Sequence, residues 1–286
     1  MSHLDDHAIA ELEARALAIR QSIIAMLVAA GSGHTAGPLG MADVFTALYF
    51  HVLRHDPKNP TWEARDRFVL SNGHICPVLY ATMAHAGYFP VSELNTLRKF
   101  ESRLQGHPHR EKLPGIETSS GPLGSGLSQA CGMAYGLRMD GKRNRVYAVL
   151  GDGELDEGNN WEAILFAGKE RLANLTVIID RNNIQIDGMT EDVLPLEPLA
   201  DKWRAFNWHV LEVNGHNIGD IIDACDQARA IYERPTVIIA HTIAGAGVKE
   251  IEFDYHWHGK PPTGEEAKRF LHELRTMGGN IKSEHE

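Results

Sequence analysis

The chain has little cysteine and no hydrophobic run long enough to cross a membrane. Cys76, Cys131 and Cys225 lie far apart in 286 residues, and none forms a CxxC pair. This argues against a disulfide framework and favours a reducing compartment. The apolar stretch at residues 23–30 is shorter than the about 20 residues that span a bilayer. Because the chain opens with acidic residues, we expect no signal peptide, no membrane partner and a cytoplasmic protein.

Positive charge is also scarce. Lys and Arg together number 28 against 38 for Asp and Glu, which gives a formal net charge of -10. A nucleic-acid partner is therefore not expected. An acidic protein that binds an anionic ligand has to concentrate positive potential locally, through helix N-termini, backbone NH groups or a bound cation.

The hydrophobic pattern predicts strands that alternate with helices. It indicates a long helix at residues 6–30 that ends at Gly31, and a second helix that begins near Gly40. Residues 105–128 are rich in Gly, Pro and Ser and are predicted to form a long irregular loop, a type that is often functional. Strands are predicted at 67–70, 145–150, 175–180, 208–214 and 235–243, with helices at 76–88, 129–140, 159–172, 218–233 and 265–276. We expect an α/β fold, a parallel sheet covered by helices on both faces, in one domain over residues 1–286.

Two consecutive predicted strands end in polar side chains with oxygen atoms. The first runs into Gly151-Asp152-Gly153, and the second is followed by Asn182. A plain turn would explain the first group, because Asp and Gly favour tight turns. However, ligands of such sheets collect at the carboxyl ends of the strands, and one Asp, one Asn, a backbone carbonyl and phosphate oxygens suit Mg²⁺. The glycines would let a diphosphate approach the backbone.

Five motifs in order carry a resemblance to a known family. They are SGHTAGPLGMADV (32–44), VLSNGH (69–74), the stretch from Gly106 to Ala134 with GPLG, the GDG-to-Asn182 pair, and WHGKPP (257–262). Together they resemble the N-terminal, diphosphate-binding half of transketolase over nearly the whole chain. The resemblance implies a thiamine-diphosphate-binding fold, with thiamine diphosphate and Mg²⁺ or another divalent cation as cofactors.

The resemblance also implies the residues of a metal and diphosphate site. Asp152 and Asn182 would be the side-chain ligands of the metal, and Ile184 would add its backbone carbonyl. Gly151 would leave room for the diphosphate, and Gly153 would donate its NH to it.

Further residues are expected to contact the rings of the cofactor and the substrate. Gly121 and Leu123 resemble residues that pack on the cofactor rings, and Ile186 resembles the apolar contact to the thiazolium. The histidines expected to line the cofactor and the substrate channel are His34, His74, His107 and His258, with His74 and His258 also counted as cofactor contacts. Each could instead be an ordinary polar residue, since the chain has sixteen histidines.

Two acidic residues and two turns lie near these motifs. Glu157 and Glu162 resemble acidic residues at the subunit contact, although charges near a helix start are also favoured by the helix dipole. After His34 the family more often has Pro-Gly, so Thr35 is expected to loosen this turn. Asp187 and the glycine that follows it are predicted to be only a turn.

The resemblance implies an enzyme that needs a partner. A full transketolase has two further domains, so we expect this chain to act with a C-terminal subunit that carries the pyrimidine-binding and C-terminal domains, in a heterotetramer. Its substrates would be sugar phosphates, and the reaction the transfer of a two-carbon ketol unit from a ketose phosphate to an aldose phosphate. Two alternatives stay open: another thiamine-diphosphate enzyme, either a 2-oxoacid dehydrogenase of the alpha type or a ketose-phosphate synthase, and a non-catalytic docking protein of the same fold.

Overall fold

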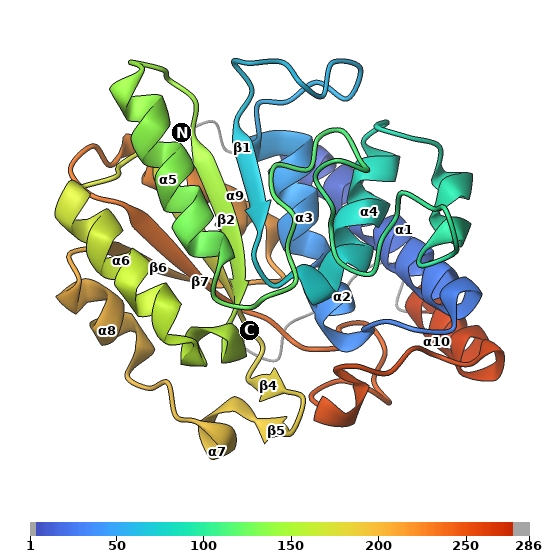
Figure 1. Ribbon diagram of the computed structural model, residues 1–286. Helices are drawn as coiled ribbons and strands as arrows, with labels where there is room; N and C mark the ends of the chain where they lie inside the picture. The colour runs from blue at the N-terminus through green and yellow to red at the C-terminus, as the bar shows by residue number, and fades with distance from the viewer. Residues whose placement is uncertain (1–3, 277–286) are drawn as a thin grey trace.

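A parallel sheet lies at the centre of the chain (Figure 1). The computed structural model describes residues 4–276, and there five parallel strands pair in the order β1-β2-β3-β7-β6. These strands are β1 (Arg67–Leu70), β2 (Val146–Gly151), β3 (Leu175–Arg181), β6 (His209–Asn214) and β7 (Thr236–His241). β2 and β3 end almost level, because Gly151 pairs with Asp180. The predicted parallel α/β sheet is confirmed.

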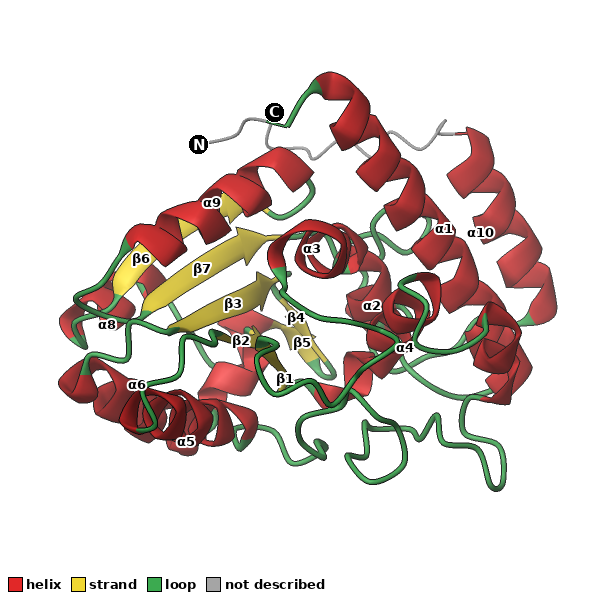
Figure 2. Cartoon of the chain, turned by 90° about the horizontal axis from the view of Figure 1, so that it is seen from above, coloured by secondary structure: helices red, strands yellow, loops and turns green. Residues whose placement is uncertain are grey.

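Helices cover both faces of this sheet (Figure 2). The α-helices of the described range are α1 (Asp6–Ala30), α2 (Ala36–Gly40), α3 (Ala42–Ala47), α4 (Cys76–His85), α5 (Gly126–Met139), α6 (Gly158–Glu170), α7 (Thr190–Val193), α8 (Leu199–Ala205), α9 (Ile218–Ala230) and α10 (Gly264–Thr276). Successive residues of β2 point to opposite sides: Tyr147 and Val149 join the cluster beneath α1, α3 and α4, whereas Ala148 and Leu150 join the cluster beneath α5 and α6. In the described range, no helix is both long and apolar enough to cross a bilayer.

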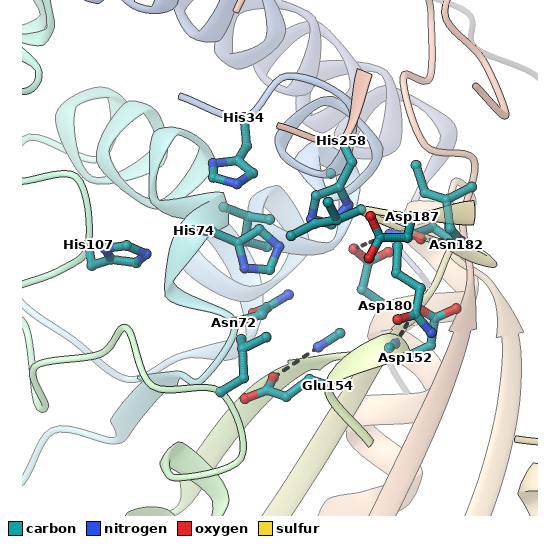
Figure 3. Close-up of a pocket in the computed structure, with 18 of the residues that line it drawn as sticks. His34, Asn72, His74, His107, Asp152, Glu154, Asp180, Asn182, Asp187 and His258 are labelled. Carbon is teal, nitrogen blue, oxygen red and sulfur yellow. Dashed lines mark hydrogen bonds between the residues drawn. The ribbon is translucent and has the colours of Figure 1, made fainter. Parts of the chain in front are cut away.

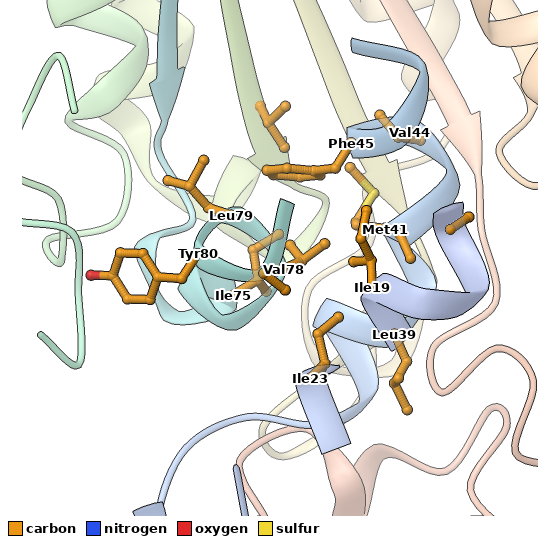
Figure 4. Packing of buried hydrophobic residues seen from close by; sticks show 14 of the residues in the cluster. Ile19, Ile23, Leu39, Met41, Val44, Phe45, Ile75, Val78, Leu79 and Tyr80 are labelled. Atoms are coloured by element: carbon orange, nitrogen blue, oxygen red, sulfur yellow. The ribbon is translucent and has the colours of Figure 1, made fainter. Parts of the chain in front are cut away.

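The larger of the two core clusters holds α1, α3 and α4 together. Figure 4 shows Ile19 and Ile23 of α1 facing Phe45 of α3 and Val78 of α4, and all four side chains are fully buried. Burying each such side chain stabilises the fold by about 1.5–3 kcal/mol. This packing holds α1 and α4 in place. The segment before α2 follows α1 in the chain, and the segment after β1 leads into α4.

The helices predicted at 76–88 and 218–233 end earlier, at His85 and Ala230, and two other helices begin several residues earlier than predicted. The helix expected from near Gly40 begins earlier, as α2, and is interrupted at Met41 before α3. At Gly40 the backbone lies against the carbonyl oxygen of Ile243, only 2.7 Å from where a Cβ would stand, so a tertiary contact sets this geometry. The helix expected from residue 129 starts at Gly126, whose NH donates to Ser71 Oγ over 3.1 Å.

A short hairpin and two short helices were not predicted. The hairpin pairs β4 (Ile184–Gln185) with β5 (Gly188–Met189), directly after the tip of β3. α7 and α8 follow it and lead the chain to β6. The two-residue strands are too short to produce a recognisable pattern of alternating side chains.

A buried ion pair connects α1 to α3. Arg20 donates to both carboxylate oxygens of Asp43, over 3.0 and 2.6 Å, and its Nε donates to the carbonyl of Leu39. His216, after β6, donates from Nδ1 to Asp43 over 2.9 Å, because its Nε2 accepts from the NH of Ile243. Burial alone would raise the pKa of Asp43, but the charge of Arg20 and the bonds from His216 and Arg20 lower it to about 2.

We predict that Asp43→Asn lowers the free energy of unfolding by about 3–5 kcal/mol, because Arg20 would keep a buried charge without its counterion. Since the folded pKa of Asp43 lies below the unfolded value, its contribution is present above about pH 4 and is lost as the pH falls towards 2. Denaturant unfolding at pH 7 measures the change. Asp201→Asn, which removes an exposed partner of Arg204, is the control and should cost less than about 1 kcal/mol. Equal losses in the two variants would contradict a special role for Asp43.

Candidate functional site

A cavity of about 330 Å³ opens at the carboxyl edge of the sheet. Figure 3 shows its lining side chains arriving from both sides, with histidines on one side and strand-end carboxylates on the other. Of the predicted site residues, those that line it are His34, His74, His107, Gly121, Leu123, Gly151, Asp152, Gly153, Asn182, Ile184, Ile186 and His258. The fold therefore brings together residues from distant parts of the chain.

Asp152 lies at the end of β2 and is almost fully buried. Its Oδ2 accepts from the NH of Asn183 over 2.7 Å and from Arg181 Nη1 over 3.1 Å. Its Oδ1 accepts from the NH of Gly153 over 2.7 Å. In this structure the Gly153 NH is thus directed at Asp152, whereas the resemblance predicts that it bonds to a diphosphate.

A second buried carboxylate, Asp180, lies one residue before the end of β3 and beside Asp152. It accepts from Thr242 Oγ1 and, over 2.8 Å, from Asn182 Nδ2. Burial raises the pKa of Asp180 to about 7, and the charge of Asp152 adds to this effect. Burial likewise raises the pKa of Asp152 to about 6, although Arg181 opposes it.

The donor set at this edge fits a divalent cation. Of the two buried carboxylates, only Asp152 pairs with a guanidinium, that of Arg181, so negative charge is in excess. Asn182 and Ile184 are close in sequence and line the same cavity. Hard oxygen ligands of this kind are those that Mg²⁺ prefers. Asn182 Oδ1 accepts from the NH of Ile184 over 3.0 Å, which fixes the turn that presents both residues to the cavity.

Arg181 is a member of the site that sequence reasoning missed. Its buried guanidinium bridges Asp152 to two carboxylates of the segment around α7, Glu191 at 2.7 Å and Glu197 at 2.9 Å. Its position next to Asn182 was the signal available, but acidic partners further along the chain could not be inferred from spacing.

Glu154 is a second missed residue. Its buried carboxylate accepts from Ser71 Oγ over 2.5 Å, from the NH of Gly124 over 2.8 Å and from the NH of Gly151 over 3.2 Å. These three partners belong to the end of β1, the GPLG segment and the end of β2. Burial raises the pKa of Glu154, and the three hydrogen bonds oppose that rise. Glu154 therefore holds three walls of the cavity in one arrangement.

Three histidines form a cluster across the cavity. The ring centroids of His34 and His74 are 4.9 Å apart, those of His74 and His258 are 5.0 Å apart, and those of His34 and His258 are 5.5 Å apart. Burial lowers the pKa of all three, and that of His34 falls to about 4. At neutral pH the cluster is therefore uncharged, and each ring can donate a hydrogen bond from one nitrogen and accept at the other.

His107 stands apart on the long loop and is exposed. Gly121, which has a φ of 148°, lies directly behind its ring. Burial and the positive charge of Arg98 lower the pKa of His107. Arg98 also lowers the pKa of His34, so this exposed cation, which sequence reasoning missed, lies at the histidine side of the cavity.

The remaining predicted residues are exposed. Leu123 and Ile186 line the cavity with exposed apolar side chains, at 40% and 68% of their full accessible area. Glu157 and Glu162 are exposed and do not line the cavity. Asp187, predicted to be only a turn, lies on the cavity wall near His258 (Figure 3).

Comparisons with known proteins identify the family. Residues 12–278 match the family described as "Transketolase, thiamine diphosphate binding domain". The 6-deoxy-6-sulfo-D-fructose transketolase subunit SqwG of Clostridium sp. (strain MSTE9) is 42% identical over 94% of this chain and 98% of that protein. An apulose-4-phosphate transketolase subunit of Actinobacillus succinogenes is 40% identical over 93% of this chain and 96% of that protein.

Longer transketolases share the same region. The chain spans 43% of the length of the Rattus norvegicus transketolase, at 41% identity. Among solved structures, transketolase from Campylobacter jejuni superposes with a TM-score of 0.87 and 35% identity, over 93% of this chain and 43% of that one. A transketolase mutant from Pichia stipitis gives 0.88 and 33% over 92% and 40%. The chain belongs to the transketolase family and corresponds to its thiamine-diphosphate-binding domain.

Proposed function

We propose that this chain is the diphosphate-binding subunit of a two-chain transketolase that moves a two-carbon ketol unit from a ketose phosphate to an aldose phosphate. The observation that carries the proposal is the meeting of the oxygen ligands of Asp152, Asn182 and Ile184 with four histidines at one cavity. The two relatives that are matched over nearly their whole length are themselves named as transketolase subunits. We also propose that residues 1–286 form a single domain and that the protein is cytoplasmic. Residues 1–3 and 277–286 lie outside the range that the structure describes.

Each part of the cavity has a task in this proposal. Asp152, Asn182 and the carbonyl of Ile184 would hold Mg²⁺ or another divalent cation, with Gly151 and Gly153 leaving room for the diphosphate. When bound, thiamine diphosphate supplies the carbon nucleophile that carries the two-carbon unit. As the family resemblance implies, Gly121, Leu123 and Ile186 would pack on its rings.

The histidines would handle substrate oxygens and protons. His34, His74 and His258 are uncharged at neutral pH, so each can take a proton at one ring nitrogen while it donates from the other. His107, on the exposed loop, would contact the part of the sugar nearer solvent. Several donors and acceptors suit a substrate with several hydroxyl groups, which a 2-oxo acid lacks.

The partner would complete the site. We propose a second polypeptide with the pyrimidine-binding and C-terminal domains, assembled as a heterotetramer in which Glu157 and Glu162 lie at a subunit contact. Their exposure is consistent with that position. An exposed carboxylate at the start of α6 is also explained by the helix dipole, so the assembly must be measured directly.

We predict that Asp152→Asn weakens binding of thiamine diphosphate in the presence of Mg²⁺ by at least about 100-fold, the upper end of what loss of an outer-sphere partner costs. The reason is that Asp152 brings the formal charge among the three proposed metal ligands. Isothermal titration calorimetry measures the affinity, and circular dichroism checks the fold. Asp192→Asn, at an exposed position of α7, is the control. Equal affinity in wild type and Asp152→Asn would contradict the metal assignment.

We predict that His107→Ala lowers turnover of the assembled enzyme by about 100-fold, within the range expected for a proton-transfer group, while thermal stability changes little. His107 is exposed, so core packing places no demand on it. Steady-state kinetics and thermal melts measure the two effects. His109→Ala, in the same loop, is the matched control. A large drop in melting temperature with normal turnover would make His107 a structural residue.

We predict that the purified chain alone, saturated with thiamine diphosphate and Mg²⁺, has no measurable ketol transfer, and that activity appears when the partner is added. Without the partner, the far end of the cofactor would lack both orientation and an activating acid. The assay uses several ketose phosphate donors and a 2-oxo acid as a comparison. Turnover of about 10 per second by the chain without its partner would refute the two-chain proposal. Turnover of the 2-oxo acid but of no ketose phosphate would favour the dehydrogenase alternative.

A further inference from the structure

The turn after His34 is bonded to the loop that carries His258. Thr35 is fully buried, and its Oγ1 donates to the carbonyl of Lys260 over 2.6 Å, across 225 positions in sequence. One residue further on, the carbonyl of Ala36 accepts from the NH of Gly245 over 2.9 Å. These two bonds hold the start of α2 against the segment from residue 242 to residue 262.

The bond from Thr35 lies next to the contact between two of the histidines. The rings of His34 and His258 meet edge to face, with centroids 5.5 Å apart and an interplanar angle of 85°. The backbone of Gly259 also lies against His34, since a Cβ at that glycine would stand 3.8 Å from His34 Nε2. The orientation of His34 thus depends on where residues 258–260 lie.

Neither ring is held by a bond of its own. Within residues 4–276, no hydrogen bond to a ring nitrogen of His34 or His258 is present, and His34 Nδ1 is buried without a partner. The orientation of both rings therefore comes from packing, including that on His74, whose ring centroid lies 4.9 Å from that of His34 and 5.0 Å from that of His258, and from the backbone segments that carry them. The bond from Thr35 to the carbonyl of Lys260 joins those two segments directly.

The far end of the His258 loop is anchored separately. Lys260 Nζ lies 3.7 Å from the centroid of the Trp257 ring and 3.0 Å from Glu266 of α10, and Trp257 packs on Phe270 with centroids 5.3 Å apart. These contacts attach the loop to α10. The hydroxyl of Thr35 attaches the same loop on the side of the cavity.

We propose that Thr35 is a positioning residue, whose hydroxyl sets the spacing and tilt of His34 relative to His258. Thr35 was expected to loosen this turn, but its side chain is buried and makes a hydrogen bond across the cavity edge. Its φ of -106° also lies outside the range of about -65 ± 15° that a proline allows. The consequence for turnover rests on the proposed function; the positioning itself does not.

The test compares Thr35→Val, which keeps the shape of the side chain but removes the hydroxyl, with Thr35→Ser, which keeps the hydroxyl. The control is Thr46→Val, which removes another buried hydroxyl that bonds to a backbone carbonyl, that of Ala42 over 2.7 Å, within α3. Nitrogen-15 NMR of the histidine rings in the isolated chain is the first measurement. We expect the ring signals of His34 and His258 to shift in Thr35→Val, and to stay in place in Thr35→Ser and Thr46→Val.

The second measurement is turnover after the partner is added. We expect kcat to fall about 10- to 100-fold in Thr35→Val, the size expected for a misplacement of about 1 Å, and to recover in Thr35→Ser. Ring signals that stay in place in Thr35→Val would overturn the positioning role, whether or not ketol transfer occurs. Ring signals that shift in Thr35→Val, together with a wild type that transfers no ketol unit, would refute the proposed function and support the positioning role.

A folding defect is distinguished by a second variant. If Thr35→Val does not fold, Thr35→Ala is judged by the same two measurements. If both variants unfold while Thr46→Val folds, the hydroxyl is needed for folding and the positioning proposal is overturned.

Discussion

The carboxylate of Asp43 in α3 joins α1 to the turn after β6. It receives Arg20 from α1 and His216 from the turn after β6, and His216 in turn accepts the NH of Ile243. A buried ion pair seldom adds much net stability over an apolar replacement, yet removal of one partner is costly. Here the ion pair connects two segments. Arg20 also bonds to the carbonyl of Leu39 in α2, and His216 also bonds to the NH of Ile243 after β7. His34 precedes the first and His258 follows in the second, so this network outside the cavity joins the segments that lead to both histidines.

The sheet imposes the second constraint. Parallel strands place all their carboxyl ends at one edge, and β2 and β3 end almost level there. Asp152 and Asp180 are thus brought into a buried position where burial raises the pKa of each carboxyl. A protein tolerates such charges only with a compensating cation or hydrogen bonds. Arg181 compensates for part of this charge, and a divalent ion fits the remainder.

The strand tips could be predicted because their signals are local. Gly151-Asp152-Gly153 and Asn182 each follow an apolar run, and one helix between two strands implies that their tips are neighbours. Arg181 and Glu154 could not be found in this way, because their partners lie in other segments and no spacing rule connects them. Thr35 was misjudged for the same reason. The family resemblance points to a proline at this position, but the carbonyl that Thr35 bonds to is 225 residues away.

The cavity also answers the question raised by the net charge of -10. A cluster of protonated histidines would supply positive charge. Burial lowers the pKa of His34, His74 and His258, so these side chains carry no positive charge at neutral pH. Positive potential for an anionic ligand must therefore come from elsewhere. On the histidine side it comes from the exposed guanidinium of Arg98, whose charge is felt by His34 and His107. On the carboxylate side Arg181 is occupied by three acids, so a phosphate group there would depend on backbone NH groups and on a bound cation. Under the proposed function, neutral histidines in the middle of the cavity would exchange protons, and the charged groups of a ligand would be held at its two ends.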